Sequence, residues 1–389
     1  MASLLLHPRA DQRCFQEWCH VTADPLRRSN LFSVQREGRA AFGEVDGWEM
    51  PRVYENIKMD YLAAKGTVAV IDRSQYGRLL VSGAKRFDLL NRLTSNDLRQ
   101  IGPGQGTHTV LLTDKGRIID DLRLHAREND YYLVTSPGNQ LRVKEHIEKL
   151  RFRDDVTLTD VTAATAMISL YGPQSAHLLE GVTHSHHLAA LAPHHHAEIA
   201  INGIRFLAAR TTEIGGTGFA LIVNGDDAES VWRTLLTRGE AYGTSPMGEE
   251  AYEMVRIEFG VPRFGREITG DHNPLETRLD DAISWTKGCY IGQEVIARLD
   301  SRQKVSKLLV GLWLEPGPVP DTGSAVEDPA RPGLQIGTLT SVAPSLDHRR
   351  VIGLAYVRND LSAVGTPLVV AAPDDRVGAV VSDLPFRKA

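Results

Sequence analysis

The sequence predicts an α+β protein of several domains, with a small β-barrel or sandwich at its C-terminus. Its 389 residues suffice for two or three domains at the usual size of roughly 100 to 200 residues each. From Gly77 onward, short apolar runs typical of strands alternate with runs whose apolar residues recur at helical spacing. From Lys307 onward the pattern changes to short β-rich runs that Gly, Pro and Asp separate.

The first elements follow an N-terminal extension. Residues 1–40 are rich in Arg, Gln, His and Ser and lack a long period, so we expect an extension with room for one helix. Residues 79–81 form an apolar strand, and Ser82 is a candidate cap for the next helix. The apolar residues of that helix are Ala84, Phe87, Leu90 and Leu93.

A β-hairpin is predicted next. Residues 122–124 alternate between apolar and polar side chains, residues 127–130 provide a polar turn, and residues 131–134 form the return strand. Asp120 and Asp121 lie at the entrance of this hairpin. A solvated turn before a strand is the structural alternative to a functional role for this acidic pair.

The order of strand, glycine and helix recurs in the second half of the chain. Residues 143–150 form an amphipathic helix that follows the hairpin. Residues 169–179 then repeat the pattern of residues 81–90, which suggests two similar α+β halves. The β-rich runs of the C-terminal part are residues 308–314, 336–342, 351–357, 368–370 and 377–381.

Composition excludes several classes of protein. Lys and Arg number 44 and Asp and Glu 49, so the net charge of −5 argues against nucleic-acid binding by phosphate neutralisation. The cysteines, Cys14, Cys19 and Cys289, are too few and too scattered for a disulfide framework and suit a reducing compartment. Neither a signal-peptide core nor a run of about 18 apolar residues occurs. We therefore expect a soluble cytoplasmic protein without a membrane partner.

The segment 287–298 is the most informative part of the sequence. Gly288 and Gly292 bracket a run that contains Cys289, and a helix is predicted from Gln293. The positive end of that helix and the nearby Lys287 would favour the thiolate and lower a pKa that starts near about 8.5. The alternative is a glycine-flanked turn whose cysteine only packs.

This segment resembles the signature of the YgfZ-type folate-binding proteins, relatives of the aminomethyltransferase (T-protein) of the glycine cleavage system. The resemblance covers all but the first 40 or so residues. The other matching stretches are residues 47–51, 72–77, 94–98, 103–105, 116–121, 172–173, 256–258, 260, 262–265, 274 and 276.

The resemblance implies a three-domain cloverleaf around a central hole that holds tetrahydrofolate or a one-carbon derivative. Two α+β (ferredoxin-like) lobes and a C-terminal β-barrel make up the cloverleaf. The implied divisions are an extension at 1–40, a first folate-binding lobe at 41–155 completed by part of 245–300, a second lobe at 156–300, and the barrel at 305–389.

The resemblance also implies the site residues. We expect Cys289, Lys287 and Asp120 to be the catalytic residues, and no metal ion. The residues expected to bind folate are Asp120, Asp121, Arg256, Glu258, Trp48, Met50 and Tyr290. A carboxylate there can accept hydrogen bonds from a reduced pterin and stabilise cationic character during one-carbon transfer.

The chain departs from the aminomethyltransferases at two runs. Residues 213–216 replace a Tyr-Thr-Gly-Glu run, so its glutamate is missing, and Tyr252 lies where a Gly-Ala-Arg-Asp run is expected. Losing a charged clamp on a buried polar ligand costs a few kcal/mol. The histidines at 184–187 and 194–196 are predicted to lie in a surface loop rather than a metal site.

Three functions follow from this reading. The leading one is a tetrahydrofolate-binding accessory protein that supports assembly or repair of iron-sulfur clusters in client enzymes, including tRNA-modifying enzymes. Its partners would be folate and iron-sulfur client or assembly proteins. The alternatives are a tetrahydrofolate-dependent aminomethyltransferase or demethylase, and a redox thiol protein that uses Cys289 without folate.

Overall fold

The computed structural model describes residues 25–216, 218–302, 305–373 and 375–387. Cys14 and Cys19 lie outside the described residues. The α-helices are α1 Phe32–Glu37, α2 Ile57–Gly66, α3 Arg86–Leu93, α4 Gln140–Leu150, α5 Ser175–Thr183, α6 Ala228–Gly239, α7 Glu249–Glu258 and α8 Gln293–Ser301. Among the described residues, no helix combines the length and the apolar character that a bilayer crossing requires.

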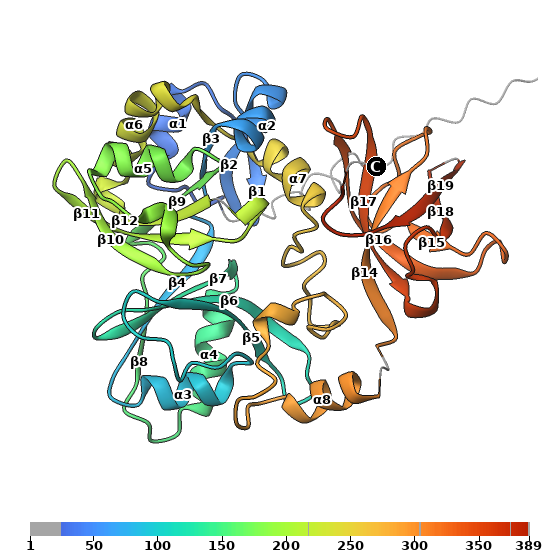
Figure 1. The fold of residues 1–389 in the computed structure, drawn as a ribbon, viewed down its shortest axis with the longest axis horizontal. Helices are drawn as coiled ribbons and strands as arrows, with labels where there is room; N and C mark the ends of the chain where they lie inside the picture. Colours follow the sequence, from blue (N-terminus) through green and yellow to red (C-terminus); the bar gives the residue numbers. More distant parts are fainter. Residues whose placement is uncertain (1–24, 217, 303–304, 374, 388–389) are drawn as a thin grey trace, which may run out of the picture.

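The first of three large parts is a six-stranded sheet in the order β10-β11-β12-β9-β3-β13 (upper left in Figure 1). Helices α5 and α6 pack on one of its faces, where Leu178, Leu179 and Trp232 are buried. The strands are β3 Val68–Asp72, β9 Thr165–Tyr171, β10 His196–Ile201, β11 Ile204–Thr211, β12 Gly218–Asn224 and β13 Thr244–Pro246.

The second part is a five-stranded antiparallel sheet in the order β5-β6-β7-β4-β8 (lower left in Figure 1). Its strands are β4 Tyr76–Ser82, β5 Gly106–Leu112, β6 Ile118–Ala126, β7 Asp130–Pro137 and β8 Thr157–Asp160. The predicted hairpin is confirmed as β6 and β7. The predicted cap at Ser82 is wrong, because Ser82 pairs with Asp130 and Thr157 as the last residue of β4, and α3 begins only at Arg86.

The third part is a closed six-stranded barrel in the order β14-β17-β16-β15-β18-β19 (right in Figure 1). Its strands are β14 Lys307–Leu314, β15 Ala325–Glu327, β16 Gln335–Ser345, β17 Arg350–Arg358, β18 Pro367–Ala372 and β19 Asp375–Ser382. Strands β14 and β19 pair and close the barrel, so a barrel and not a sandwich forms. Two α+β parts and a terminal barrel confirm the predicted fold class.

The two sheets face each other across a small apolar layer. Tyr132 and Val134 on β7 pack with Met167, Leu207 and Ile222 of the six-stranded sheet. The chain crosses between the sheets more than once, since β3 and β9 lie in one sheet and β4 to β8 in the other. The domain boundaries at 155 and 300 stay predictions.

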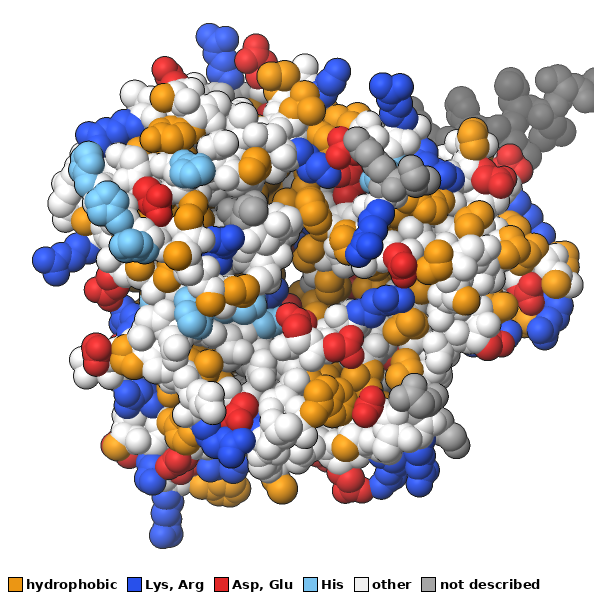
Figure 2. Space-filling model, in the orientation of Figure 1, with side chains coloured by type: hydrophobic (Ala, Val, Ile, Leu, Met, Phe, Trp, Pro, Cys, Tyr) orange, Lys and Arg blue, Asp and Glu red, His pale blue; other side chains and the backbone are white. Residues whose placement is uncertain are grey.

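Helix α7 joins the six-stranded part to the barrel. It packs against α2, against β2 (Trp48–Val53) of the short hairpin with β1 (Ala41–Val45), and against barrel strands β16 and β17. Its apolar residues Met254 and Ile257 share one buried cluster with the barrel residues Ile352 and Leu354. The three parts therefore meet around the middle of the molecule, where the surface is hollowed (Figure 2).

Candidate functional site

Two adjoining cavities lie against the five-stranded sheet, one between it and the six-stranded sheet and the other between it, α7 and residues 261–268. Including space that is open to solvent, the first measures about 470 Å³ and is the larger of the two, and the second measures about 370 Å³. Tyr76, Asp121, Arg123 and Glu213 line both cavities. Charged side chains rarely lie buried unless they are paired, so this shared wall is the first candidate for a functional site.

Strand β6 determines which acidic side chain reaches the cavities. Successive side chains of a strand point to opposite faces of the sheet. Leu122 and Leu124 belong to the apolar core behind the five-stranded sheet, whereas Asp121 and Arg123 line the cavities. Asp120 shares the face of the two leucines and lines neither cavity.

Asp121 is a buried carboxylate held between two cationic groups. Its Oδ2 lies 2.5 Å from Nη1 of Arg123, and its Oδ1 is hydrogen-bonded to Nε2 of His108. Burial alone would raise the pKa of Asp121, but the charges of Arg123 and His108 hold it well below its ordinary value. The carboxylate is therefore ionised at neutral pH.

Asp120 has a different environment. Its carboxylate accepts hydrogen bonds from the backbone N–H of Ser136, at 3.1 Å, and of Asp121, at 2.8 Å. Burial raises the pKa of Asp120 to about 7. Both aspartates are buried within β6, so the solvated-turn alternative is wrong. A folate contact by either residue stays a prediction, for which the geometry favours Asp121.

Glu213 places a carboxylate in the cavities from the turn that precedes β12. Its Oε2 accepts a hydrogen bond from the Tyr171 hydroxyl at 2.8 Å, and its Oε1 lies 3.4 Å from Nη2 of Arg123. Glu213 is not among the predicted site residues, because the resemblance implies a pterin-binding glutamate only where Gly216 stands. The turn therefore keeps an acidic group in spite of that replacement.

The guanidinium of Arg73 covers the ring of Tyr252 on α7. The Arg73 guanidinium carbon lies 3.4 Å from the ring centre, and its Nη1 lies 2.7 Å from Glu249. Nε and Nη2 of Arg73 are buried and have no hydrogen-bond partner among the described residues. Arg73 follows β3, and no sequence pattern predicted that it would lie beside the smaller cavity, which Tyr252 lines.

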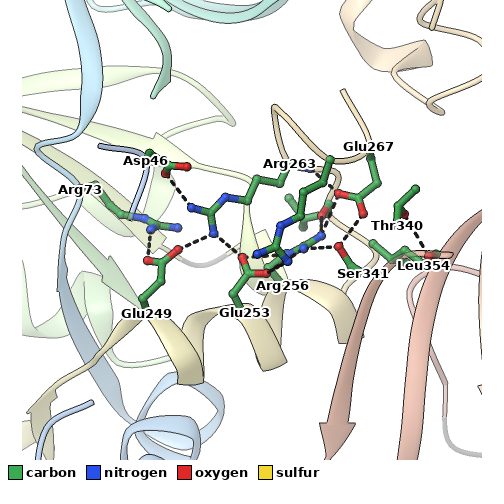
Figure 3. A network of polar contacts seen from close by, with 12 residues as sticks. Asp46, Arg73, Glu249, Glu253, Arg256, Arg263, Glu267, Thr340, Ser341 and Leu354 are labelled. Carbon is green, nitrogen blue, oxygen red and sulfur yellow. Dashed lines mark hydrogen bonds and ion pairs between the residues drawn. The ribbon is translucent and has the colours of Figure 1, made fainter. Parts of the chain in front are cut away.

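Arg256 belongs to an ionic network that connects α7 to the barrel (Figure 3). Its guanidinium, 1 % exposed, binds Glu253 at 2.8 Å, Glu267 at 3.0 Å and the Ser341 hydroxyl of β16 at 2.5 Å. Arg263 extends the network to Glu249, Glu253 and Asp46. Arg256 also lines the smaller cavity, and its contact with folate stays a prediction.

Glu258 lies two residues after Arg256, at the end of α7, and lines neither cavity. Its carboxylate accepts hydrogen bonds from the hydroxyls of Tyr61 and Ser345 and pairs with Lys65 at 3.0 Å. It therefore connects α2 and α7 with the barrel.

Three further predicted folate contacts lie outside both cavities. Trp48 and Met50 form a small buried cluster with Val45 in the β1–β2 hairpin. Tyr290 is buried in another cluster, with Ile118 and Ile296. The structure brings together Asp121 and Arg256 of the predicted folate residues, but not these three.

The segment 287–298 has the predicted local structure. Gly292, at φ +85°, precedes α8, and Cys289 is exposed before it. The Lys287 ammonium donates to the carbonyls of Asn91, Thr94 and Asn96 at 2.6 to 2.7 Å. An ammonium has three donors, so these carbonyls occupy it fully, and burial lowers its pKa to about 8. This geometry favours a structural contact over assistance to the Cys289 thiolate.

The histidine-rich region divides into two groups. His184, His186 and His187 are exposed, as predicted for a surface loop. His196 is buried in β10, so the surface-loop prediction is wrong there, because its register with Ala209 draws it into the sheet. His194, in the turn before β10, lines the larger cavity.

Models of two known domain families match most of this chain. Residues 31–287 match the model of the GCVT N-terminal domain, and residues 307–388 match the glycine cleavage T-protein C-terminal barrel domain. Together these matches span both sheets and the barrel.

Similar proteins share nearly the whole length of the chain. An aminomethyltransferase of Shouchella clausii (strain KSM-K16) is 31 % identical over 368 residues, which cover 93 % of this chain and 98 % of that protein. An aminomethyltransferase of Bacillus subtilis (strain 168) is 28 % identical over 370 residues, covering 93 % and 99 %. The crystal structure of glycine cleavage system aminomethyltransferase T from Bartonella henselae superimposes with a TM-score of 0.84 at 24 % identity, over 93 % of this chain and 98 % of that one.

These relatives correct the predicted function. The accessory role in iron-sulfur cluster assembly, with its client partners, is wrong, because relatives of 27 to 31 % identity over most of the chain are named aminomethyltransferases. The alternative that names an aminomethyltransferase agrees with them, and so does the expected folate ligand. The two domain matches and the full-length similarity show that the chain belongs to the glycine cleavage T-protein family.

Proposed function

We propose that this protein is a tetrahydrofolate-dependent aminomethyltransferase. The observation that carries the proposal is the buried, ionised Asp121 in the wall shared by the two cavities, in a chain whose relatives bear that name. The proposed substrate is an aminomethyl group carried on a lipoyl arm. Tetrahydrofolate would supply the amine nitrogens that accept the one-carbon unit.

The residues of the cavity wall suit a reduced pterin. Tyr76 and Tyr171 offer aromatic surface for a planar ring, while Asp121 and Glu213 offer acceptors for its N–H groups. Ionised Asp121 would also stabilise positive charge that develops during one-carbon transfer, and a buried carboxylate is more effective there than one in water.

Arg123 and His108 keep the carboxylate of Asp121 in place for this role. Arg123 fixes one oxygen and also faces Glu213, so that it orients two acceptors with one guanidinium. His108 fixes the other oxygen. Because neither acceptor has to rearrange when a ligand arrives, the site is organised before binding.

Within this family, we also propose that the chain is similar to the YgfZ-type members in residues 287–298, the segment that carries the exposed Cys289. The thiol is a surface feature there, and the proposed reaction does not use it. The demethylase alternative has no separate observation in its favour.

The test is a transfer assay with an aminomethylated lipoyl carrier protein, with and without tetrahydrofolate. We expect folate-dependent release of ammonia, and a loss of about 100-fold or more in kcat/KM for Asp121→Asn, because a preorganised electrostatic group at developing charge contributes roughly 3 kcal/mol. Glu148→Gln, an exposed change on α4, is the control. Folate binding without any turnover would overturn the proposal.

A further inference from the structure

Three potential metal ligands converge beside the cavities from distant parts of the sequence. His108 lies on β5, His194 in the turn before β10, and Asp281 in the short 3-10 helix Asp280–Ala282. One ligand atom from each lies within 4.8 Å of the other two. His108 Nδ1 and Asp281 Oδ2 are 3.0 Å apart, and the two imidazole rings are 5.8 Å apart at 39°.

The second observation is the orientation of His108. Its Nε2 is hydrogen-bonded to Asp121, so Nδ1 is the atom that faces the other two groups. Histidines that bind metal ions almost always donate their other ring N–H to a carboxylate or carbonyl, which fixes the ring and makes the ligand more basic. Asp121 already occupies that supporting position.

His194 is held with an unused ring. Its backbone N–H donates to the Arg210 carbonyl at 3.0 Å, and its own carbonyl is hydrogen-bonded to Nδ1 of His125 at 3.1 Å. No hydrogen bond to its ring nitrogens occurs within the described part of the chain. A neutral imidazole fixed through its backbone and lacking a ring partner is suited to bind a cation.

We propose that His108, His194 and Asp281 bind one divalent transition-metal ion of the Zn²⁺ class. Two imidazole nitrogens and one carboxylate are a zinc ligand set, whereas Ca²⁺ and Mg²⁺ prefer oxygen ligands alone. At metal–ligand distances of about 2.1 Å, the ligand atoms of a tetrahedral site lie about 3.4 Å apart. Small side-chain rotations would bring these three ligand atoms to that spacing. The fourth position remains open, since Asp281 is exposed and His194 lines the larger cavity.

Without a metal ion, the same groups form hydrogen bonds that compete with metal binding. A protonated His108 then bridges Asp121 and Asp281, and Arg123 and His194 are the other titratable groups that face it. A metal ion at Nδ1 must displace the proton on that nitrogen. The inference goes beyond the proposed aminomethyl transfer and does not depend on it.

The experiment is a calorimetric titration of the full chain with Zn²⁺, after removal of metal by a chelator and in the absence of folate. Cys14, Cys19 and Cys289 are replaced by serine, because thiolates bind zinc on their own. We expect one ion per chain. Co²⁺ in its place should give the visible absorption of a tetrahedral site without thiolate charge-transfer bands.

Two variants test the ligands, and two match them as controls. His194→Ala and Asp281→Asn should each weaken Zn²⁺ binding at least tenfold, whereas His184→Ala and Asp280→Asn should not change it. Thermal unfolding in the presence of a chelator checks that each variant is folded. If His194→Ala is unstable, Asp281→Asn, which changes an exposed side chain, still tests the proposed ligands. No saturable binding, or unchanged affinity in Asp281→Asn, would overturn the proposal, and neither result bears on aminomethyl transfer.

Discussion

The most direct test of the site's electrostatics is Asp121→Asn, read out on His108. Burial alone would lower the pKa of His108, but Asp121 is the largest of the groups that raise it to about 9. The amide keeps the shape and removes the charge, so burial should then dominate and the pKa should fall below the ordinary 6.5. A fall from about 9 to below 6.5 corresponds to about 3 kcal/mol or more of interaction between the two side chains.

The measurement is an NMR titration of the histidine ring protons in the presence of a chelator. His108→Gln identifies the resonance of His108. We expect a histidine that titrates near pH 9 in the parent protein and not in Asp121→Asn. A pKa that stays above 8 in the variant would refute the assignment of Asp121 as the main partner.

The same pair predicts the pH dependence of stability. Because the pKa of His108 is raised in the folded state, its stabilisation is fully present below pH 6.5 and is lost as pH rises through about 9. The free energy of unfolding in urea should therefore fall by about 3 kcal/mol more between pH 6.5 and 9 in the parent than in Asp121→Asn. The pKa of Lys287 is lowered to about 8, so its contribution to the free energy of unfolding rises with pH instead of falling. Because this contribution is the same in the parent and in Asp121→Asn, it cancels when the two proteins are compared.

The remaining predictions concern the signature segment and the barrel contact. Lys287→Met should lower the free energy of unfolding by about 2 to 3 kcal/mol, because three backbone carbonyls lose their hydrogen-bond donor. Lys115→Met, at an exposed lysine, is the control. Equal destabilisation by the two substitutions would contradict a stabilising role for the Lys287 contact. Arg256→Met should cost about 3 to 5 kcal/mol in urea unfolding by leaving Glu253 and Glu267 unpaired, and adding Glu267→Leu should recover part of that loss. With Cys14 and Cys19 replaced by serine, Cys289 should react with an alkylating reagent in the folded protein, and Lys287→Met should leave the rate unchanged. A tenfold slower reaction would mean that Lys287 does assist the thiol.

Local structure and family could be predicted from the sequence. The turn at 127–130 and the helix that begins at Gln293 depend on neighbouring residues, so periodicity and glycine placement suffice for them. The terminal β-rich runs predicted a β domain, and the resemblance of residues 41–389 predicted the T-protein superfamily. The predicted accessory function is wrong because the short motif around Cys289 does not determine the reaction, whereas relatives similar over nearly the whole chain are named aminomethyltransferases.

The contents of the site depended on tertiary structure. Strand alternation implies that Asp120 and Asp121 face opposite ways, but only the packing of the second sheet determines that the Asp121 face borders the cavities. Lys287 faces carbonyls at the end of α3 and just after it, far earlier in the chain. Glu213, Arg73 and His194 reach the cavity region from turns with no periodic pattern. Periodicity reports which face of an element is apolar, whereas the neighbours of a buried charge are determined by contacts between segments that are distant in sequence.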